Sequence, residues 1–387
     1  MFLLKKNAVF NKPKVLVLAH EPFVNGASLS LLTILKGLRE NFNFLVLIPE
    51  AGPLEEVLTE DRINYQIFGL ERSGYLEYKN FKDHIIRFYK YNKNREQTLS
   101  NLKRLVAKFE PEVIYTNTST ISIGYDLAII TNTPHIWHIR EFGDIGLNIG
   151  YLPSKNCNAW KMRRSTCCIF TTSILKKHWV NNSINSKVVY NGIDQPTPFR
   201  NIKISRTDRI VIGVVGWIVE AKGQHSAVNI LAQLSQLNSD FFLHFYGSYN
   251  VTCEYYLNLQ KLIETNNLQS KVFFKGQVQQ AEIYTEIDIL LSTGYNEGFG
   301  RAIVEAMSCG IPVVARNSGG PSELLENNFD GFLFDSEELA VSSIHKLIND
   351  KNLVAEITHN AFNSWKCKFS TYSYLNSINE IFMSILK

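Results

Sequence analysis

The sequence lacks the features that mark membrane-spanning and exported chains. No apolar run approaches the roughly 20 residues that a membrane-spanning helix needs, and the longest candidates are Val15–Ala19 and Ile210–Val219. The first residues, MFLLKK, do not form the apolar core of a signal peptide. We therefore expect a chain that is neither exported nor threaded through a bilayer by itself.

Disordered, fibrous and disulfide-dependent proteins are also excluded by the composition. Only 11 of the 387 residues are proline, whereas 45% are hydrophobic and 20% are charged, as in soluble globular proteins. The six cysteines form no C-x-x-C pair and have no histidine at the spacing of a zinc site. We expect reduced thiols and a cytoplasmic protein.

The length and the order of the apolar segments predict two domains. A single hydrophobic core stops growing at roughly 250 residues, and this chain is longer. Short β-branched runs alternate with helix-like periodicity, which is the pattern of parallel sheets covered by crossover helices. We predict an α/β protein with a doubly wound domain over residues 1–194, a linker over 195–208 and a second doubly wound domain over 209–366. A C-terminal helix over 367–387 has an apolar stripe, so we expect it to pack back toward the first domain.

Positive charge is concentrated in the first half of the chain. Residues 1–194 carry 25 Lys and Arg against 17 Asp and Glu, whereas residues 195–387 carry 15 against 19. Two clusters stand out, Lys79–Lys108 with nine basic residues and Lys155–Lys177 with six, and both are interleaved with apolar side chains: Phe81, Phe88, Tyr89, Tyr91, Trp160 and Met162. Such clusters suit an anionic membrane surface or a phosphate-bearing acceptor, although a solvated helix face is the alternative for either one. No recognised nucleic-acid motif accompanies them, so we expect no nucleic acid as a partner.

The strongest motif spans Gly294–Met307, where a predicted strand ends, a glycine-containing loop follows and a helix begins. Gly298 and Gly300 allow the backbone to approach a ligand closely, and the free N–H groups of the helix start favour a diphosphate. Glu297 and Glu305 stand eight positions apart and can bind two different hydroxylated parts of one ligand. Glu305 lies in an apolar stretch, where an unpaired carboxylate would be costly, and this argues against a solvated surface position.

This motif resembles the E-x7-E element of glycosyltransferase family 4, in the run EGFGRAIVEAMSCGIPVVA. The similarity continues through Ser318–Glu323, and Asn191–Asp194 is similar to the N-G-[VI]-D of the family. The resemblance implies a GT-B fold, in which two facing doubly wound, Rossmann-like domains enclose a central cleft. It also implies a retaining transferase that takes its sugar from a nucleotide-diphosphate sugar.

The same resemblance assigns the donor to the loop and helix start of the second domain. Glu305 would bind the ribose hydroxyls of the nucleotide, and Glu297 would contact hydroxyls of the donor sugar. Gly298, Phe299 and Gly300 would line the donor beside them. The resemblance implies no covalent nucleophile, because the leaving phosphate helps to deprotonate the acceptor on the same face of the sugar.

Lys222 and Arg301 are the candidate cations for the diphosphate. Lys222-Gly223 keeps the Lys-Gly pair of the family, whereas Trp217 stands where the family usually shows an arginine. Arg301, just inside the predicted helix, is our candidate for the missing charge, with a structural surface arginine as the alternative. We expect Lys222 to be catalytic because a fixed positive charge stabilises the departing diphosphate.

The first-domain candidates follow predicted strands. Gly26 precedes a helix and resembles the glycine-rich loop of the family, which approaches the diphosphate or the acceptor. His138 corresponds to the histidine that contacts the donor sugar in the family, and it ranks above His20 as a functional histidine. Strand alternation places His138 and Arg140 on one face, and Arg140 and Glu141 are expected to point into the cleft or toward its acceptor side. A buried core histidine with a structural Arg–Glu pair is the alternative.

The absence of several ligand-binding motifs bears on the cofactor. The chain has no D-x-D, P-loop or full G-x-G-x-x-G, and the nearest acidic pair, Glu286 and Asp288, lies at the start of a predicted strand. We therefore expect no metal and no organic cofactor, with cationic side chains and helix ends in their place. The favoured activity is transfer of a hexose to a polysaccharide or lipid-linked acceptor at the inner membrane face. A GT-B sugar-nucleotide epimerase, a phosphorylase and a non-catalytic sugar-nucleotide-binding partner are the alternatives.

Overall fold

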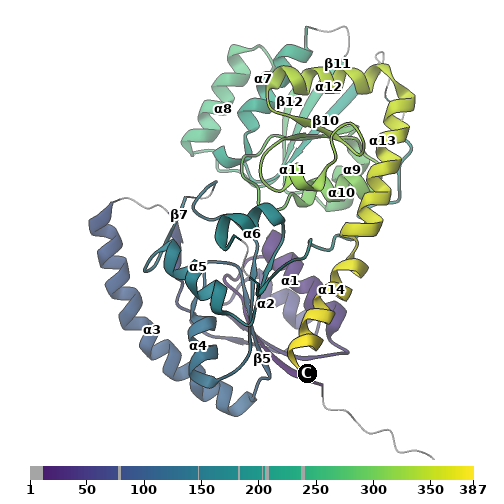
Figure 1. The fold of residues 1–387 in the computed structure, drawn as a ribbon. Coiled ribbons are helices and arrows are strands. Elements are labelled where there is room, and N and C mark those ends of the chain that lie inside the picture. The colour runs from purple at the N-terminus through teal and green to yellow at the C-terminus, as the bar shows by residue number, and fades with distance from the viewer. Residues whose placement is uncertain are drawn as a thin grey trace, which may run out of the picture.

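The computed structural model describes residues 12–76, 80–146, 148–181, 184–202, 204, 209–236 and 240–387. The chain start, Lys79 of the first basic cluster, and residues 203 and 205–208 of the expected linker lie outside the described residues. Two α/β domains are stacked one above the other, and a helix from the end of the chain lies against the first of them (Figure 1). The predicted fold class, two Rossmann-like parallel sheets covered by helices, is confirmed.

The first domain is built on a seven-stranded parallel sheet in the order β3-β2-β1-β5-β6-β8-β9. Its central strands are continuous apolar runs because helices cover both faces of the sheet. The strand order changes direction between β1 and β5, so the loops after these two strands flank the crevice in which such sheets bind ligands. The strands are β1 Lys14–Leu18, β2 Asn43–Ile48, β3 Tyr65–Ile67, β5 Val113–Asn117, β6 His135–Ile139, β8 Cys167–Phe170 and β9 Ser186–Val188.

The second domain repeats this design with a six-stranded parallel sheet in the order β12-β11-β10-β13-β14-β15. Its direction changes between β10 and β13, and the loops after these strands face the first domain. The strands are β10 Arg209–Val215, β11 Asp240–Tyr246, β12 Val272–Gly276, β13 Ile289–Ser292, β14 Val313–Arg316 and β15 Phe332–Phe334.

Helices cover both sheets, and their starts follow strand ends. The first domain contributes α1 Gly26–Leu38, α2 Pro53–Glu60, α3 Phe81–Phe109, α4 Ile123–Thr131, α5 Lys155–Arg164 and α6 Ser173–Trp179. The second contributes α7 Gln224–Leu234, α8 Glu254–Thr265, α9 Gln280–Glu286, α10 Arg301–Cys309, α11 Pro321–Leu324, α12 Glu337–Asn349 and α13 Lys351–Ser364. A short 3₁₀ turn, Glu220–Lys222, precedes α7.

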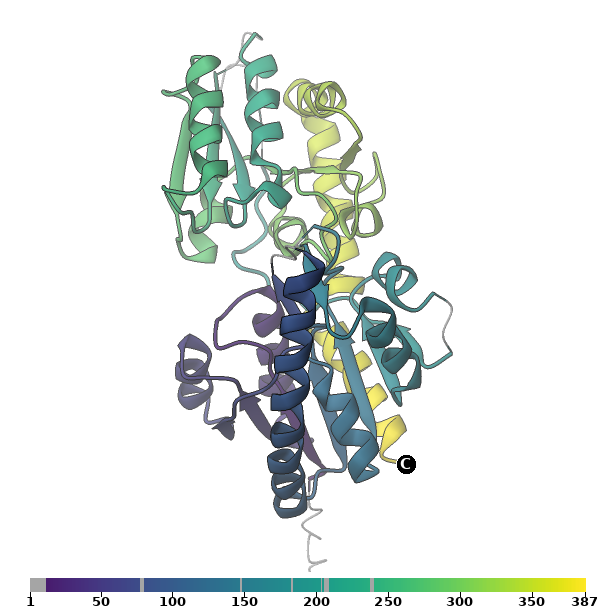
Figure 2. The same cartoon turned by 90° about the vertical axis from the view of Figure 1, so that its left-hand side faces the viewer.

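The last helix, α14 Thr371–Ile385, leaves the second domain and packs into the core of the first (Figure 2). A π-helical turn, Trp365–Phe369, joins it to α13. Its buried stripe consists of Tyr374, Ile378, Ile381 and Phe382. The ring of Phe382 stacks on Tyr115 of β5, with ring centroids 5.9 Å apart. The helix α14 therefore covers the face of the sheet toward which the Tyr115 side chain points.

Two features of the first domain do not follow from the strand pattern. The short strands β4 Gly74–Leu76 and β7 Ile149–Tyr151 form an antiparallel pair beside the main sheet. The helix α3 is 29 residues long and extends along one side of the domain, with only Tyr91, Leu99, Leu102 and Val106 buried. Together the strand pair and α3 add a second wall to the crevice of the sheet.

The structure corrects part of the charge analysis. Met162 is fully buried, so it cannot reach a membrane, and Tyr91 of the first cluster is also buried. Lys161 is buried and its Nζ pairs with Asp126 Oδ2 at 2.9 Å. The second basic cluster therefore presents fewer free charges than the sequence suggested, because α5 turns part of it into the core.

None of the helices in the described part of the chain combines the length and the apolar character needed to cross a bilayer. The six cysteines are all described and all free, with Cys167, Cys168 and Cys309 buried. Burial raises the pKa of the Cys167 thiol to about 11, so this thiol stays protonated near neutral pH.

Candidate active site

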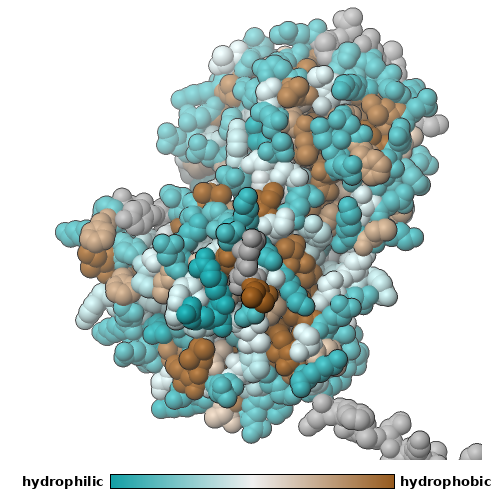
Figure 3. Space-filling model, in the orientation of Figure 1, coloured by the Kyte–Doolittle hydropathy of each residue, from teal (hydrophilic) through white to brown (hydrophobic). Residues whose placement is uncertain are grey.

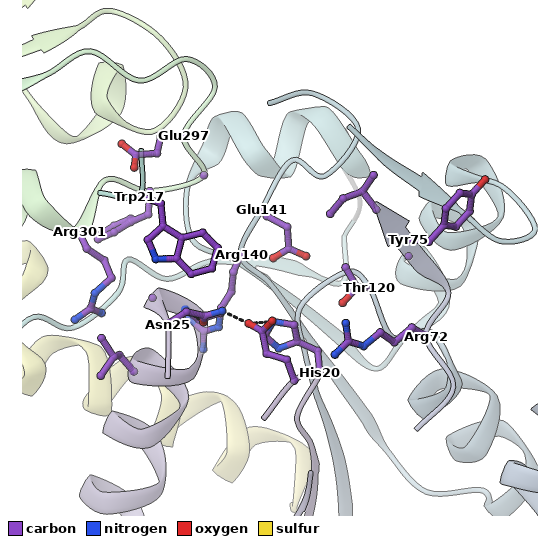
Figure 4. Close-up of a pocket in the computed structure, with 18 of the residues that line it drawn as sticks. His20, Asn25, Arg72, Tyr75, Thr120, Arg140, Glu141, Trp217, Glu297 and Arg301 are labelled. Carbon is purple, nitrogen blue, oxygen red and sulfur yellow. Dashed lines mark hydrogen bonds and ion pairs between the residues drawn. The ribbon is translucent and has the colours of Figure 1, made fainter. Parts of the chain in front are cut away.

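A cavity of about 1190 Å³ lies between the two domains and is lined by both of them. The second domain supplies the loops after β10 and β13 and the start of α10, and the first supplies the loops after β1, β5 and β6 together with α3 (Figure 4). Most of the residues predicted from sequence meet there: Gly26, Arg140, Glu141, Lys222, Glu297, Gly298, Phe299, Gly300, Arg301 and Glu305.

Lys222 and Glu297 form an ion pair on the second-domain wall. Lys222 ends the 3₁₀ turn before α7, and Gly223 behind it has a φ of +66°, where a Cβ would meet the Thr293 carbonyl oxygen at 2.4 Å. This close packing fixes the turn against the end of β13. Both side chains are half-buried and line the cavity, so each can exchange its partner for a ligand group.

Glu305 is only 6% exposed, although its carboxylate lines the cavity. The Tyr284 hydroxyl donates to Glu305 Oε2 at 2.7 Å, and Arg301 Nη2 lies 3.6 Å from Oε1. Burial, followed by the charge of Glu305, raises the pKa of Tyr284 well above its ordinary value, so the tyrosine remains a donor. One carboxylate oxygen is thereby fixed while the other is held by a single long ion pair, which a ligand hydroxyl can replace.

The start of α10 has no side-chain cap, which leaves backbone N–H groups free for an anion. Gly300 precedes it with a φ of +110°, a conformation that other residues rarely adopt. Arg301 then reaches across the cavity, and its Nη1 donates to Ser30 Oγ of α1 at 3.1 Å. A Cβ on Gly26 would stand 3.2 Å from Arg301 Cδ, so glycine at this position makes room for the arginine.

Arg140 is a buried cation at the floor of the cavity, surrounded by neutral partners. Its Nε donates to Asn117 Oδ1 and its Nη1 to Asn191 Oδ1, each at 2.7 Å. Its Nη2 lies 3.3 Å from the Tyr374 hydroxyl and 3.4 Å from His138 Nδ1. Within the described residues no carboxylate lies within 4.0 Å of the guanidinium, so its charge is balanced only by dipoles.

The prediction that His138 contacts the donor sugar finds no support in the arrangement of the cavity. His138 is fully buried and does not line the cavity, because α14 covers its face of β6 and Tyr374 lies against the imidazole, with ring centroids 6.5 Å apart. The Tyr115 hydroxyl and Arg140 both approach Nδ1, at 2.7 and 3.4 Å. Burial and the nearby guanidinium hold the pKa of His138 well below its usual value, so the imidazole is neutral. It positions Arg140, as the shared strand face suggested.

His20, on the loop after β1, lines the cavity, whereas His138 does not. Its Nε2 lies 2.8 Å from Glu21 Oε1, and Asn25 Nδ2 also donates to that carboxylate (Figure 4). Asn25 Oδ1 caps α1 by accepting from the backbone N–H groups of Ala27 and Ser28, at 2.9 and 3.1 Å. These two N–H groups are therefore already paired in this structure.

Several residues of the cavity wall were missed by the sequence analysis. Trp217, discussed only as a departure from the family pattern, is 59% exposed and projects into the cavity (Figure 4). Arg72, Tyr75 and Lys90 form the opposite end of the cavity, on the loop before β4, on β4 and on α3. Only the clustering of Lys90 with other basic residues could have indicated this end of the cavity from the sequence. The strand pair β4 and β7 has no strong hydrophobic pattern that would reveal it.

The two domains also contact each other directly beside the cavity. Glu323 of α11 caps the start of α6 across the interface, since its carboxylate accepts from Ser173 N at 2.8 Å, Ser173 Oγ at 2.6 Å and Ile174 N at 3.1 Å. The Tyr190 hydroxyl donates to the same carboxylate at 3.0 Å. Gly298 lies against the Arg140 carbonyl oxygen, where a Cβ would come within 2.3 Å. These contacts fix the Glu297 loop over the carboxyl end of β6.

No group of three metal-ligating side chains occurs among the described residues. The acidic pair noted in the sequence is used structurally: Asp288 Oδ2 accepts from the Val211 N–H at 2.8 Å, and Glu286 binds Lys275 and the Tyr246 hydroxyl, each at 2.7 Å. The described groups that line the cavity include carboxylates, cations and backbone N–H groups.

A family and several known proteins are similar to this chain in sequence. Residues 197–364 match the family described as "Glycosyl transferases group 1". The chain is 29% identical over 183 residues to the poly(ribitol-phosphate) alpha-N-acetylglucosaminyltransferase of Staphylococcus aureus strain COL, covering 46% of this chain and 36% of that protein. It is 25% identical over 182 residues to the capsular polysaccharide biosynthesis glycosyltransferase CapM of S. aureus, covering 46% and 47%. The matched regions thus span less than half the length of either relative.

Solved structures share the fold over nearly the whole chain. The Anabaena protein HepE in complex with UDP has a TM-score of 0.78 and 22% identity, covering 96% of this chain and 100% of that one. A variant of S. aureus TarM in complex with fondaparinux, alpha-GlcNAc-glycerol and UDP has a TM-score of 0.71 and 15% identity, covering 97% and 99%. The chain therefore has the two-domain GT-B fold, and its residues 197–364 match the group 1 glycosyl transferases.

Proposed function

We propose that the protein is a retaining, metal-independent glycosyltransferase that moves a hexose from a nucleotide-diphosphate sugar to a polysaccharide or lipid-linked acceptor. The observation that carries the proposal is that Glu297, Glu305, Lys222 and the uncapped start of α10 face one cavity between the domains. The match of residues 197–364 to group 1 glycosyl transferases supports it. The UDP bound by HepE and by the TarM variant supports a nucleotide-diphosphate sugar as the donor.

The donor lies along the second-domain wall. Glu305 Oε1 accepts hydrogen bonds from the ribose hydroxyls while Tyr284 holds the other oxygen of the carboxylate. The N–H groups at the start of α10 and the side chain of Arg301 bind the diphosphate. Lys222 leaves Glu297 to bind a phosphate oxygen, and Glu297 is thereby released to accept hydrogen bonds from the sugar hydroxyls.

The transfer requires no group that becomes covalently attached to the sugar. The bond between the anomeric carbon and the phosphate oxygen breaks, and its electron pair stays on the diphosphate. The acceptor hydroxyl attacks the anomeric carbon from the same face, and its proton passes to the leaving phosphate oxygen. Lys222, Arg301 and Arg140 supply positive charge where the negative charge develops, which is where an electrostatic contribution lowers the barrier most.

The shape of the cavity favours transfer over epimerisation. An epimerase needs acid and base groups around the anomeric carbon but no room for a second sugar. Here the cavity continues past Arg140 and Glu141 to Arg72 and Tyr75, away from the groups that would hold the donor (Figure 4). An acceptor can bind in this second region while the donor is bound.

A panel of sugar nucleotides tests the proposal. The matching donor should raise the midpoint of thermal unfolding, because a ligand at 100 times its Kd stabilises a protein by about 2.7 kcal/mol. The product formed with that donor should keep the anomeric configuration when its coupling constants are measured by NMR, and EDTA should leave the rate unchanged. An inverted product would contradict retention, loss of rate in EDTA would contradict metal independence, and no stabilisation by any donor would contradict the proposal itself.

The free end of α3 supports a second part of the proposal, peripheral binding of the first domain to the anionic cytoplasmic face of a membrane. Phe81 and Tyr89 are 70% and 72% exposed there, and Ile85 is half-exposed. Figure 3 shows apolar side chains gathered at this end of the helix. Lys82 and Lys93 lie beside them without an ion pair in the described part of the chain. Apolar and basic groups on one helix face are typical of interfacial helices.

Sedimentation with vesicles tests this part. The protein should bind anionic vesicles, release in high salt and ignore neutral vesicles, since each basic residue near an anionic surface contributes about 1 kcal/mol. The double variant Phe81→Ser with Tyr89→Ser should bind more weakly. Tyr372→Ser, which changes an equally exposed aromatic on α14, is the matched control and should bind like the wild type. If the double variant binds anionic vesicles as well as Tyr372→Ser does, the end of α3 does not contact the membrane.

A further inference from the structure

We propose that the first-domain end of the cavity is an acceptor subsite that recognises a phosphate group carried by the acceptor. The inference rests on the proposed transferase function and extends it to a class of acceptor. Its residues are Arg72, Tyr75, Arg87 and Lys90, which we call the acceptor wall. The wall lines the same cavity as Glu297 and Lys222. Its members Arg72 and Tyr75 lie at the other end of the cavity from Glu297 (Figure 4).

The acceptor wall is built on fixed elements. Tyr75 lies on β4, and its hydroxyl is 2.8 Å from His84 Nδ1 of α3, while His84 Nε2 lies 3.1 Å from the Pro153 carbonyl oxygen. The Arg87 guanidinium stacks on the Tyr75 ring at 4.7 Å, and its Nε donates to Asp83 Oδ2 at 2.7 Å. An aromatic ring and a stacked guanidinium are thus held in place before any ligand arrives.

Arg72 and Lys90 supply the uncompensated charge of the wall. Both are exposed to the cavity, and neither has a carboxylate within 4.0 Å among the residues that the structure describes. The two acidic residues at this end are otherwise engaged. Glu141 accepts from the N–H and the hydroxyl of Ser119, at 2.7 and 2.5 Å. Burial raises the pKa of Glu71, and the Asn94 side chain donates a hydrogen bond to its carboxylate.

The acceptor wall differs from an ordinary solvated basic surface because its unpaired cations line a cavity. Elsewhere in the same cavity Lys222 is paired with Glu297 and Arg301 with Glu305, and Arg140 is buried among neutral hydrogen-bond partners. At the acceptor wall Arg72 and Lys90 line the cavity together with an aromatic ring, and neither cation has a carboxylate within 4.0 Å among the described residues. A phosphate provides the missing charge, since guanidinium and ammonium groups bind its oxygens by charge-assisted hydrogen bonds, while Tyr75 offers a face to an adjoining sugar ring.

Two chemical sources present such a phosphate: the phosphodiester of a polyol-phosphate chain and the diphosphate of a lipid-linked sugar. Titration calorimetry with three probes separates them. The probes are a tetramer of glycerol phosphate, a short-chain polyprenyl diphosphate N-acetylglucosamine and neutral maltotetraose, each measured with and without saturating UDP. At least one phosphate-bearing probe should bind about 10-fold or more tightly than maltotetraose with UDP present. The tighter of the two anionic probes identifies the source.

Two variants place the binding on the acceptor wall. Arg72→Ser and Lys90→Ser should each weaken the anionic probe about 5-fold, and the double variant should lose its preference over maltotetraose. The Kd of UDP should stay unchanged in both variants. Lys103→Ser, which removes the same charge farther along α3 and outside the cavity, is the matched control and should change neither affinity.

Three results would overturn the inference. These are equal affinity for charged and neutral probes, loss of the preference when UDP is added, and an unchanged preference in the double variant. The proposed function can fail separately, because it predicts stabilisation by a sugar nucleotide and that measurement involves no acceptor. A protein that binds a donor but shows no phosphate preference would keep the transferase proposal and lose the acceptor subsite.

Discussion

The two walls of the cavity hold their charges in different ways. On the second-domain wall, Lys222 pairs with Glu297 and Arg301 with Glu305. On the first-domain side, Arg140 is buried among amide, hydroxyl and imidazole groups and meets no carboxylate within the described residues. Paired charges can exchange partners when a ligand arrives, whereas a cation fixed by dipoles exerts the same field before and during the reaction. Lys222 and Arg301 can therefore respond to a bound ligand, whereas Arg140 is already in position before a ligand binds.

Removing the fixed cation should have the largest effect. Arg140→Leu deprives Asn117 Oδ1 and Asn191 Oδ1 of their donors inside the protein, and buried polar atoms left without partners cost about 1–3 kcal/mol each. We expect the free energy of unfolding in urea to fall by about 3 kcal/mol. Arg72→Leu, a change of the same type at an exposed position, should stay within about 0.5 kcal/mol of the wild type. Equal stability of both variants would mean that the dipoles around Arg140 contribute nothing.

Removing an exchangeable cation should act on turnover. Lys222→Ala should lower kcat by about 100-fold, because loss of one positive charge that stabilises a developing anion costs roughly that much. Lys275→Ala is the control, since Lys275 is also paired with a carboxylate, Glu286, but lies outside the cavity. Normal turnover in Lys222→Ala together with a large loss in Arg301→Ala would show that the two cations have the opposite roles.

The two domains should also differ in their response to acid. Burial lowers the pKa of His135 to about 3, below its ordinary value of 6.5. Between these pH values the unfolded chain binds a proton that the folded chain does not, so His135 makes stability fall as the pH falls, by about 1.4 kcal/mol per pH unit. Burial also lowers the pKa of His244 in the second domain, but Glu286, whose Oε1 lies 3.1 Å from its Nδ1, opposes the shift.

Unfolding of His135→Gln measured from pH 7 to pH 4 tests this difference. Below pH 6.5 the free energy of unfolding of the variant should depend less steeply on pH, by about the slope that the binding of one proton produces. His244→Gln should change the slope less. An unchanged slope in His135→Gln would mean that this imidazole is not held neutral in the folded state.

Loosening the contact between the walls should have the smallest effect. Glu323→Gln replaces the carboxylate that caps α6 across the interface, and caps of this kind contribute about 1 kcal/mol. Hydrogen exchange at the amides of Ser173 and Ile174 should accelerate about 5-fold, which corresponds to that energy. Glu326→Gln, on the same segment but exposed, should leave these amides unchanged. Unchanged exchange at these amides in Glu323→Gln would mean that this contact does not help to hold the two domains together.

The second-domain wall could be predicted from sequence because its residues are close together in the chain. Glu297 and Glu305 lie on one loop and the helix that follows it, so local spacing alone brings both to the end of β13. The parallel sheets were predictable for the same reason, since each strand shows its own apolar run. Long-range packing does not alter such local patterns.

The first-domain wall could not be predicted in this way. Alternation placed His138 and Arg140 on one face, but it could not show that α14, more than 200 residues later, covers that face and leaves only Arg140 at the cavity. Arg72 and Tyr75 reach the cavity through a strand pair, β4 with β7, whose members are about 75 residues apart and only three residues long. Contacts set by distant segments leave little periodicity in the sequence.

The affinity of the Glu305→Gln variant for UDP tests the central claim, that the second-domain wall holds the nucleotide, most directly. The glutamine keeps the shape of the side chain, and its amide oxygen can still accept from Tyr284. Its NH2 group then faces the ribose, and this group donates hydrogen bonds but cannot accept them. Calorimetry should give a Kd for UDP at least about 10-fold weaker than that of the wild type, whereas Glu297→Gln should change it little and lower turnover instead. Equal affinity of the wild type and Glu305→Gln for UDP would contradict the claim.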